Sequence, residues 1–455
     1  MKQVRTTALA AMAAAAALAV TACGGNTSGT SGSGGSSPSV KPSASATASV
    51  QPAPTAKKID LGGQKIRIAA NFDDTPKDDS PIGKARIEKQ KEVEAKYNVK
   101  VEYVNIPQKE IQDKFTTSIL AGEPIAEVMR LATSVLPSMG EKGMFLPLED
   151  LTELNNEKNF PLDFMKRVGS YKGKTYGFST GFGHSFGIYY NKTLFQKNGL
   201  TDLHELVDKK GWTWAAFEEV AKKATRDADG DGKIDTWGLS AFAADFAQGL
   251  IAANAGEIVD DKGVVQLESA NTMEAMNFFN KLFNESKVVR FVNPNDWGEQ
   301  RKFFTEGNVA MVPGYAYEGA DLKKSMTNVK WGYVPFPIGP KATDYASAYS
   351  QIPMYFIPKG AKNPKEVLQI WKELQLWDKQ AESQMNSWEV WLDNADDIAT
   401  AKLLSTKTVP VPIAAFPGFP FANMTTSVAK GETTPAAAIA KIKQEAQAKV
   451  DAVLK

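Results

Sequence analysis

The sequence predicts an α/β protein whose folded part forms two lobes. Short apolar runs alternate with amphipathic stretches from residue 59 to residue 178, and this βαβ rhythm is typical of a largely parallel sheet flanked by helices. A second block of strands and helices follows from residue 189 to residue 312. The folded stretch is about 395 residues long, more than one hydrophobic core usually serves, so two lobes are expected.

The first block is expected to contain three strands and two helices. Apolar and alternating runs predict strands over residues 66–70, 99–104 and 128–131. Helical spacing of apolar residues predicts one helix over residues 82–97 and another that ends at Gly122.

The second block and the C-terminal part continue this mixture. Thr213 is placed to cap a helix that buries Phe217, and a further helix carries Met276 and Phe279. Strands are expected again over residues 330–334 and 354–357. An amphipathic helix is expected over residues 435–454.

The N-terminal segment, residues 1–22, has the parts of a secretory signal peptide. It begins with Lys2 and Arg5, and its alanine-rich stretch is too short for a convincing membrane-spanning helix. Small residues then precede Cys23, the only cysteine, in an arrangement that resembles the bacterial lipobox. We expect an acylated Cys23 that anchors the protein at the outer face of the membrane. The alternative is an ordinary signal peptide with an incidental cysteine.

The segment after this cysteine is expected to be a disordered tether. Residues 24–58 are almost wholly Gly, Ser, Thr, Ala and Pro. Such a composition cannot bury enough apolar surface to fold. The folded part therefore starts near Lys58.

Charge and residue usage exclude several classes of function. The formal charge is +1, and removal of residues 1–22 takes away two positive charges and leaves −1. A near-neutral chain without a basic cluster argues against a nucleic-acid partner. A lipidated Cys23 leaves no thiol for disulfides, metal binding or catalysis. Only His184 and His204 remain, too few for a multi-histidine metal centre.

Residues 227–238 match the pattern of a calcium-binding loop. Alternate carboxylates on a tightly turning loop converge on one point, and a hard cation prefers six to eight oxygen ligands. Gly232 would permit the sharp turn, whereas Gly238 stands where an EF-hand has its bidentate glutamate. The alternative is a solvated acidic turn. We expect a structural Ca²⁺ site with side-chain ligands and one carbonyl ligand from these residues: Asp227, Asp229, Asp231, Asp235 and the carbonyl of Lys233.

A glycine-dense passage covers residues 176–191 between two strand-like runs. It lacks the Gly-Lys-Ser/Thr ending of a phosphate loop, so a hinge or a ligand-lining segment fits it better. His184 lies inside this passage, where a binding role and a purely structural role remain equally open.

No residue constellation indicates an enzyme. A glycosidase needs two carboxylates on opposite sides of a bond, and no motif singles out such a pair. A serine triad would have to recruit His184 or His204, the only two histidines of the chain. Aromatic residues are abundant, and flat aromatic faces can grip the apolar faces of sugar rings, although most aromatics belong to cores.

Several segments, in this order along the chain, resemble the family 1 extracellular solute-binding lipoproteins of bacterial ABC importers, which include maltose and oligosaccharide binders. The segments are residues 118–124 (SILAGEP), 143–148 (GMFLPL), 187–192 (GIYYNK), 212–217 (WTWAAF), 304–311 (FTEGNVAM) and 431–438 (GETTPAAA). The acidic loop also resembles the calcium site of some such binders.

The resemblance implies a two-lobe, periplasmic-binding-protein-like fold of type II with an interlobe cleft. It places crossings near residues 178–183, 331–334 and 376. Lobe 1 would comprise residues 59–180 and 332–376, and lobe 2 residues 181–331 and 377–455. The ligand-binding positions it implies are His184, Asp245, Phe246, Tyr315, Tyr317, Phe416 and Phe419.

The implied function is binding without turnover. The protein would capture a carbohydrate, close around it as a monomer and deliver it to the membrane subunits of an ABC permease. The alternative is a lipid-anchored surface protein that binds a macromolecular partner or a sensor.

Overall fold

The computed structural model describes residues 59–181, 185–349 and 352–454. Residues 58–455 form one compact unit. The predicted signal peptide, Cys23 and the tether lie outside the described residues, and so does His184. None of the helices in the described part of the chain has the length and apolar character needed to cross a bilayer.

The first lobe is built on a four-stranded sheet of order β12-β3-β1-β2. Its strands are β1 (Gln64–Ala70), β2 (Val99–Asn105), β3 (Val128–Ala132) and β12 (Pro353–Phe356). β1 pairs in parallel with β2 and β3, whereas β12 pairs antiparallel with β3. The lobe also contains α1 (Pro81–Tyr97), α2 (Gln108–Leu120), α3 (Leu162–Val168), α11 (Pro364–Leu374) and the short hairpin β4 (Ser170–Tyr171) with β5 (Lys174–Thr175).

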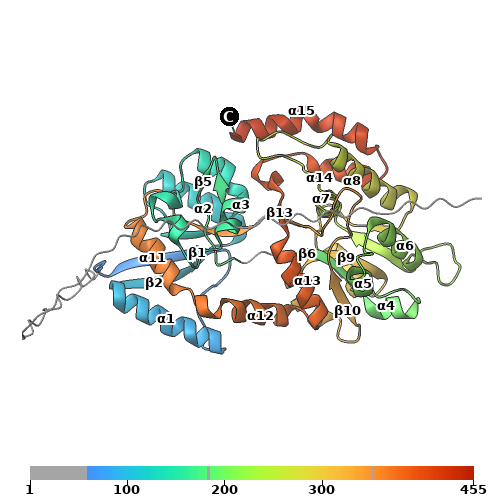
Figure 1. The fold of residues 1–455 in the computed structure, drawn as a ribbon. Coiled ribbons are helices and arrows are strands. Elements are labelled where there is room, and N and C mark those ends of the chain that lie inside the picture. The colour runs from blue at the N-terminus through green and yellow to red at the C-terminus, as the bar shows by residue number, and fades with distance from the viewer. Residues whose placement is uncertain (1–58, 182–184, 350–351, 455) are drawn as a thin grey trace, which may run out of the picture. The chain divides into compact units, whose positions relative to one another are not determined.

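Local chemistry explains where α1 begins and ends. The Ser80 hydroxyl accepts a hydrogen bond from the Gly83 amide at 3.1 Å, and Pro81 occupies the first turn, where its missing N–H costs nothing. The helix stops at Asn98, whose φ of 50° is left-handed. α11, drawn in orange, packs beside blue α1 although the two helices are far apart in sequence (Figure 1).

The second lobe is built on a five-stranded sheet of order β10-β6-β9-β7-β8. Its strands are β6 (Phe186–Asn191), β7 (Trp237–Ala241), β8 (Val289–Phe291), β9 (Val309–Tyr315) and β10 (Trp331–Val334). The helices before residue 330 are α4 (Lys192–Lys197), α5 (Leu203–Asp208), α6 (Trp214–Ala224), α7 (Ala243–Ala253), α8 (Ala270–Asn280), α9 (Glu299–Thr305) and α10 (Gly319–Ser325). The later ones are α12 (Gln380–Trp391), α13 (Ala395–Thr406), α14 (Phe421–Ala429) and α15 (Pro435–Leu454).

A separate two-stranded ladder pairs β11 (Ser347–Tyr349) in parallel with β13 (Thr408–Pro410). The short helical turns include η1 (Thr133–Val135), η2 (Leu136–Gly140), η6 (Ala316–Glu318) and η8 (Pro412–Ala415). η8 of the second lobe contacts η1 and η2 of the first.

The hydrophobic residues gather into separate clusters that follow this division. One cluster contains β1, β2, β3 and β12 together with α11, and two others surround the five-stranded sheet. The predicted α/β architecture with two lobes is therefore confirmed.

One predicted boundary differs from the structure. β10 pairs antiparallel with β6, from Trp331 opposite Asn191 to Val334 opposite Ile188, so it belongs to the second sheet. The predicted crossing near residues 331–334, and the start of lobe 1 at residue 332, are wrong for this reason. The chain returns to the first sheet between Tyr349 of β11 and Pro353 of β12.

Candidate functional site

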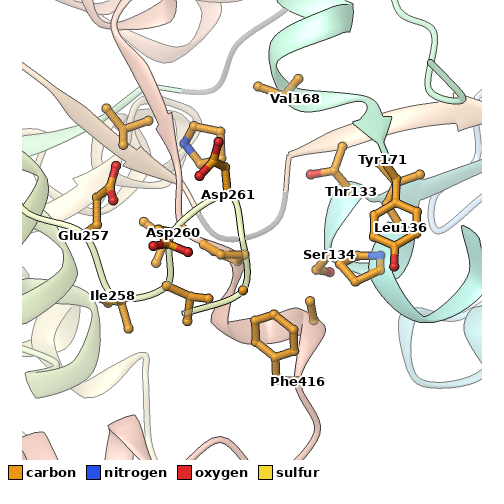
Figure 2. Close-up of a pocket in the computed structure, with 18 of the residues that line it drawn as sticks. Thr133, Ser134, Leu136, Val168, Tyr171, Glu257, Ile258, Asp260, Asp261 and Phe416 are labelled. Atoms are coloured by element: carbon orange, nitrogen blue, oxygen red, sulfur yellow. The ribbon is translucent and has the colours of Figure 1, made fainter. Parts of the chain in front are cut away.

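A cavity of about 710 Å³ lies between residues of the two lobes. The first lobe contributes Thr133, Ser134, Leu136, Val168 and Tyr171. The second lobe contributes Glu257, Ile258, Asp260, Asp261 and Phe416, and Figure 2 shows these two groups facing one another. A second hollow of about 510 Å³ shares Ser134 and Tyr349 with the first. We call the two together the interlobe cleft.

The cleft forms where strands of the first sheet end. Residues 133–135 follow directly after β3, and residues 71–72 follow directly after β1. The carboxyl ends of parallel strands meet at one edge of a sheet, which is where α/β folds bind ligands. The Thr133 amide donates a 2.7 Å hydrogen bond to the carbonyl of Ile352, so the turn after β3 is held against the returning chain.

A pair of tyrosines lies at the end of β9 on the second lobe. The rings of Tyr315 and Tyr317 are stacked, with centroids 5.5 Å apart and planes 4° apart. The Tyr349 ring meets Tyr315 edge-on at 5.1 Å, and the Trp391 ring meets Tyr317 edge-on at 6.5 Å. Tyr317 is 39% exposed, so this tyrosine pair offers a flat apolar face to solvent.

Asp245 places a carboxylate near this pair. It lies in the first turn of α7, and its Oδ2 accepts a 2.8 Å hydrogen bond from the Trp297 indole. Burial raises the pKa of Asp245, although the Trp297 hydrogen bond acts in the opposite direction. The charge of Asp245 also acts on the phenol of Tyr315. A carboxylate beside stacked aromatic rings suits a ligand that has hydroxyl groups and apolar faces.

The other residues implied by the resemblance fall into different surroundings. Phe416 lines the cleft, and Phe419 is half-buried with its ring 6.2 Å from that of Phe416. Phe246 is fully buried among Phe217, Phe279 and Phe336, at ring distances of 6.1–6.2 Å. We therefore assign Phe246 to the core and remove it from the candidate ligand contacts.

The sequence interpretation missed several residues of the first lobe. Phe72 lines the smaller hollow, is 42% exposed and lies beneath the Arg130 guanidinium at 5.1 Å. Arg130 also donates a 3.2 Å hydrogen bond to the side chain of Asn71. Their position in the sequence could have identified them, because Asn71 and Phe72 directly follow β1.

The acidic loop closes on itself in the structure. Carboxylate oxygens of Asp227, Asp229 and Asp235 lie within 4.8 Å of one another. The amides of Gly230 and Gly232 donate to Asp227 at 2.7 and 2.8 Å, and both glycines have positive φ. The Asp231 carboxylate instead accepts a 2.8 Å hydrogen bond from the Lys233 amide.

Packing explains the glycine at position 238. A Cβ there would lie 2.3 Å from the carbonyl oxygen of Ala221 in α6. The close approach of β7 to α6 therefore excludes a side chain at the position where an EF-hand has its last ligand.

The family model described as bacterial extracellular solute-binding protein matches residues 78–375, more than half of the chain. This chain belongs to the bacterial extracellular solute-binding proteins. It is thus a binding protein and not an enzyme, and the family places it outside the cytoplasm. No curated protein matches the chain.

Solved structures of solute-binding proteins share the fold. The sugar-binding protein MalE of Xanthomonas citri is 15% identical, with a TM-score of 0.66 and coverage of 86% of this chain and 98% of that chain. The GacH receptor of Streptomyces glaucescens, solved unliganded and with acarbose, is 20% identical, with a TM-score of 0.61 and coverage of 86% and 99%. An ABC substrate-binding protein of Listeria monocytogenes in complex with cycloalternan is 20% identical, with a TM-score of 0.60 and the same coverage.

Proposed function

We propose that this solute-binding protein captures a carbohydrate, with an oligosaccharide as the best fit, in its interlobe cleft. The observation that carries the proposal is the stacked Tyr315–Tyr317 face beside the half-buried carboxylate of Asp245, which adjoins the cleft where Tyr315 meets the cleft residue Tyr349. Flat aromatic faces pack on sugar rings, and a carboxylate accepts hydrogen bonds from sugar hydroxyls. The sugar-binding proteins of the same fold support this assignment.

Two lobes that contribute separate walls suit capture by closure. A ligand that contacts both walls binds the closed form better than the open form and shifts the population toward it. If the open form is more stable than the closed form by roughly a few kcal/mol, a ligand that prefers the closed form can make it the major one. The closed form then delivers the sugar to the membrane subunits of an ABC permease, and the protein acts as a monomer.

A thermal-shift screen of residues 58–455 against mono- and oligosaccharides tests the proposal. A ligand present at about 100 times its Kd stabilises the folded state by about 2.7 kcal/mol. We expect a rise of several degrees in Tm with one class of glycan. A folded protein whose Tm responds to none of the sugars would contradict the carbohydrate assignment.

We also propose that Cys23 anchors the protein through lipid and that residues 24–58 hold the folded unit away from the membrane. Buried acyl chains contribute about 0.8 kcal/mol per CH₂ group. The variant Cys23→Ala is expected to appear in the culture medium or as an unprocessed precursor, and not to incorporate radiolabelled palmitate. Palmitate incorporation by this variant would contradict the anchor.

A bound Ca²⁺ is proposed for the loop from Asp227 to Asp235. Three carboxylates whose oxygens lie within 4.8 Å of one another repel each other without a cation, and alternate oxygens on a tight turn suit calcium. The loop joins α6 to β7, at some remove in sequence from the cleft residues, so its role would be structural.

Chelation tests the calcium proposal. We expect EGTA to lower the Tm of residues 58–455 by several degrees and added Ca²⁺ to restore it, because a ligand of the folded state alone stabilises that state. The variant Asp227→Asn should have the lowered Tm with or without chelator. Asp261→Asn, an exposed acidic residue outside the loop, serves as the matched control. An unchanged Tm of the wild type in EGTA would show that the loop is a solvated turn.

A further inference from the structure

A buried glutamate lies directly beside the tyrosine pair. Glu318 ends the short turn η6 and is only 3% exposed. A buried carboxylate costs free energy unless other groups hydrogen-bond to it or pair with its charge. Glu318 lies between the tyrosine pair and the core of the second lobe, so its hydrogen bonds can hold the tyrosine pair in place.

The contacts of Glu318 fix the backbone that carries the tyrosine pair. Its Oε1 accepts a 2.7 Å hydrogen bond from the Tyr315 amide. The buried hydroxyl of Tyr189 donates to the carbonyls of Tyr315 and Ala316, each at 2.9 Å. The turn from β9 into η6 is therefore held by Glu318 at its N–H group and by Tyr189 at its carbonyls.

Glu318 is also linked to Asp245, through Arg301 and Trp297. The Arg301 Nη1 donates a 3.2 Å hydrogen bond to Glu318 Oε2. The same guanidinium lies 5.9 Å from the centre of the Trp297 ring, and the Trp297 indole donates to Asp245. The position of Arg301 thus couples Glu318 to the Trp297–Asp245 pair.

The surroundings of Glu318 make its charge responsive to pH. Burial raises its pKa to about 7, against the opposing effects of the Tyr315 amide and of Arg301. Both protonation states are therefore populated near neutral pH. The titratable and charged groups that face it come from seven elements: Arg301 of α9, Asp321 of α10, Asp245 of α7, Tyr315 of β9, Tyr317 of η6, Tyr189 of β6 and Tyr333 of β10.

We propose that Glu318 is a positioning residue of the interlobe site, whose negative charge holds both the Tyr315–Tyr317 face and, through Arg301, the Trp297–Asp245 pair in their binding geometry. The predicted effect of Glu318 on ligand affinity rests on the proposed carbohydrate function, whereas its predicted effect on the geometry of the site does not.

The direction of the pH effect follows from the contacts. Protonation neutralises the carboxylate, so the bond from the Tyr315 amide becomes a weaker neutral one and Arg301 keeps only Asp321, whose side chain is 62% exposed. The site then loosens. Affinity for ligand should therefore fall as the pH falls through about 7.

The first test needs no sugar. Residues 58–455 are labelled with 5-fluorotryptophan, and the ¹⁹F resonances of Trp297 and Trp391 are assigned with Trp297→Phe and Trp391→Phe. In the wild type we expect both resonances to shift with one midpoint near pH 7. That midpoint should vanish in Glu318→Gln and persist in the matched control Glu306→Gln, which removes an exposed carboxylate at the end of α9 that does not act on Glu318. No such midpoint in the wild type, or the same midpoint in Glu318→Gln, would overturn the proposal.

The second test measures affinity for maltotetraose by calorimetry about one pH unit below and above 7. We expect the wild type to bind about fivefold more weakly at the lower pH, the difference between a charged and a neutral hydrogen-bonding partner. Glu318→Gln should bind with the weaker affinity at both pH values. Equal pH dependence in both proteins would overturn the proposal. Failure of maltotetraose to bind at all would count against this sugar as cargo, and the fluorine titration would still decide the role of Glu318.

Discussion

Replacement of Tyr317 by Ala is expected to weaken glycan binding by about 30-fold or more, because the variant loses half of the stacked face. Truncation of a tyrosine at the centre of a binding site costs about 2 kcal/mol or more, and 1.4 kcal/mol is tenfold in Kd. The measurement is calorimetric titration of residues 58–455 with the glycan that raises the Tm most in the screen. Tyr317 is 39% exposed, so the loss should lower the Tm of the unliganded protein less than truncation of a fully buried aromatic residue does.

Phe291→Ala is the matched control for this experiment. Phe291 is 37% exposed, lies on the edge strand β8 and has its ring beneath Lys430, away from the tyrosine pair. Its removal should leave Kd unchanged. Equal losses of affinity in the two variants would show that the effect is general and that the tyrosine pair is not the binding face.

Replacement of Phe246 by Ala is expected to have the opposite pattern, with lost stability and retained affinity. Phe246 is fully buried and packs against Phe217, Phe279 and Phe336. Truncation of a buried phenylalanine costs about 3–5 kcal/mol, through lost burial and the cavity that remains. The urea midpoint of the variant should fall accordingly, and Phe246→Leu should fall less because it refills most of the volume.

Affinity separates the two roles of this side chain. At a temperature where Phe246→Ala is still folded, its Kd for the same glycan should stay close to that of the wild type. An unchanged urea midpoint together with a large loss of affinity would contradict the core assignment and return Phe246 to the ligand contacts.

The local spacing of apolar residues predicted the positions of these helices and strands well. The terminal helix was expected over residues 435–454 and occupies Pro435–Leu454, and the first βαβ unit appears as β1, α1 and β2. These elements are specified by local periodicity and caps, such as the Ser80 hydroxyl at the start of α1.

The lobe boundary could not be read from local pattern because a strand looks the same whichever sheet receives it. β10 joins the second sheet through its pairing with β6, about 140 residues earlier in the chain. Only the non-local register of Trp331 opposite Asn191 decides this membership.

The candidate site shows the same limit at the level of single side chains. Asp245 and Phe246 are neighbours on α7, and successive helical side chains point about 100° apart. Asp245 therefore lies near the tyrosine pair while Phe246 enters the core, although the resemblance implies that both contact the ligand. Tyr315 ends β9 and Tyr317 lies in the turn η6, so no single periodicity of the sequence places their rings on one face, and only the structure shows that they stack.

A crystal structure of residues 58–455 with the most stabilising glycan would show whether the tyrosine pair and Asp245 bind the sugar. We expect a sugar ring against the exposed face of Tyr317, a hydroxyl within hydrogen-bonding distance of Asp245, and contacts from the first lobe near Thr133 and Ser134. A glycan bound elsewhere on the protein, without contact to Tyr317 or Asp245, would contradict the proposed binding site.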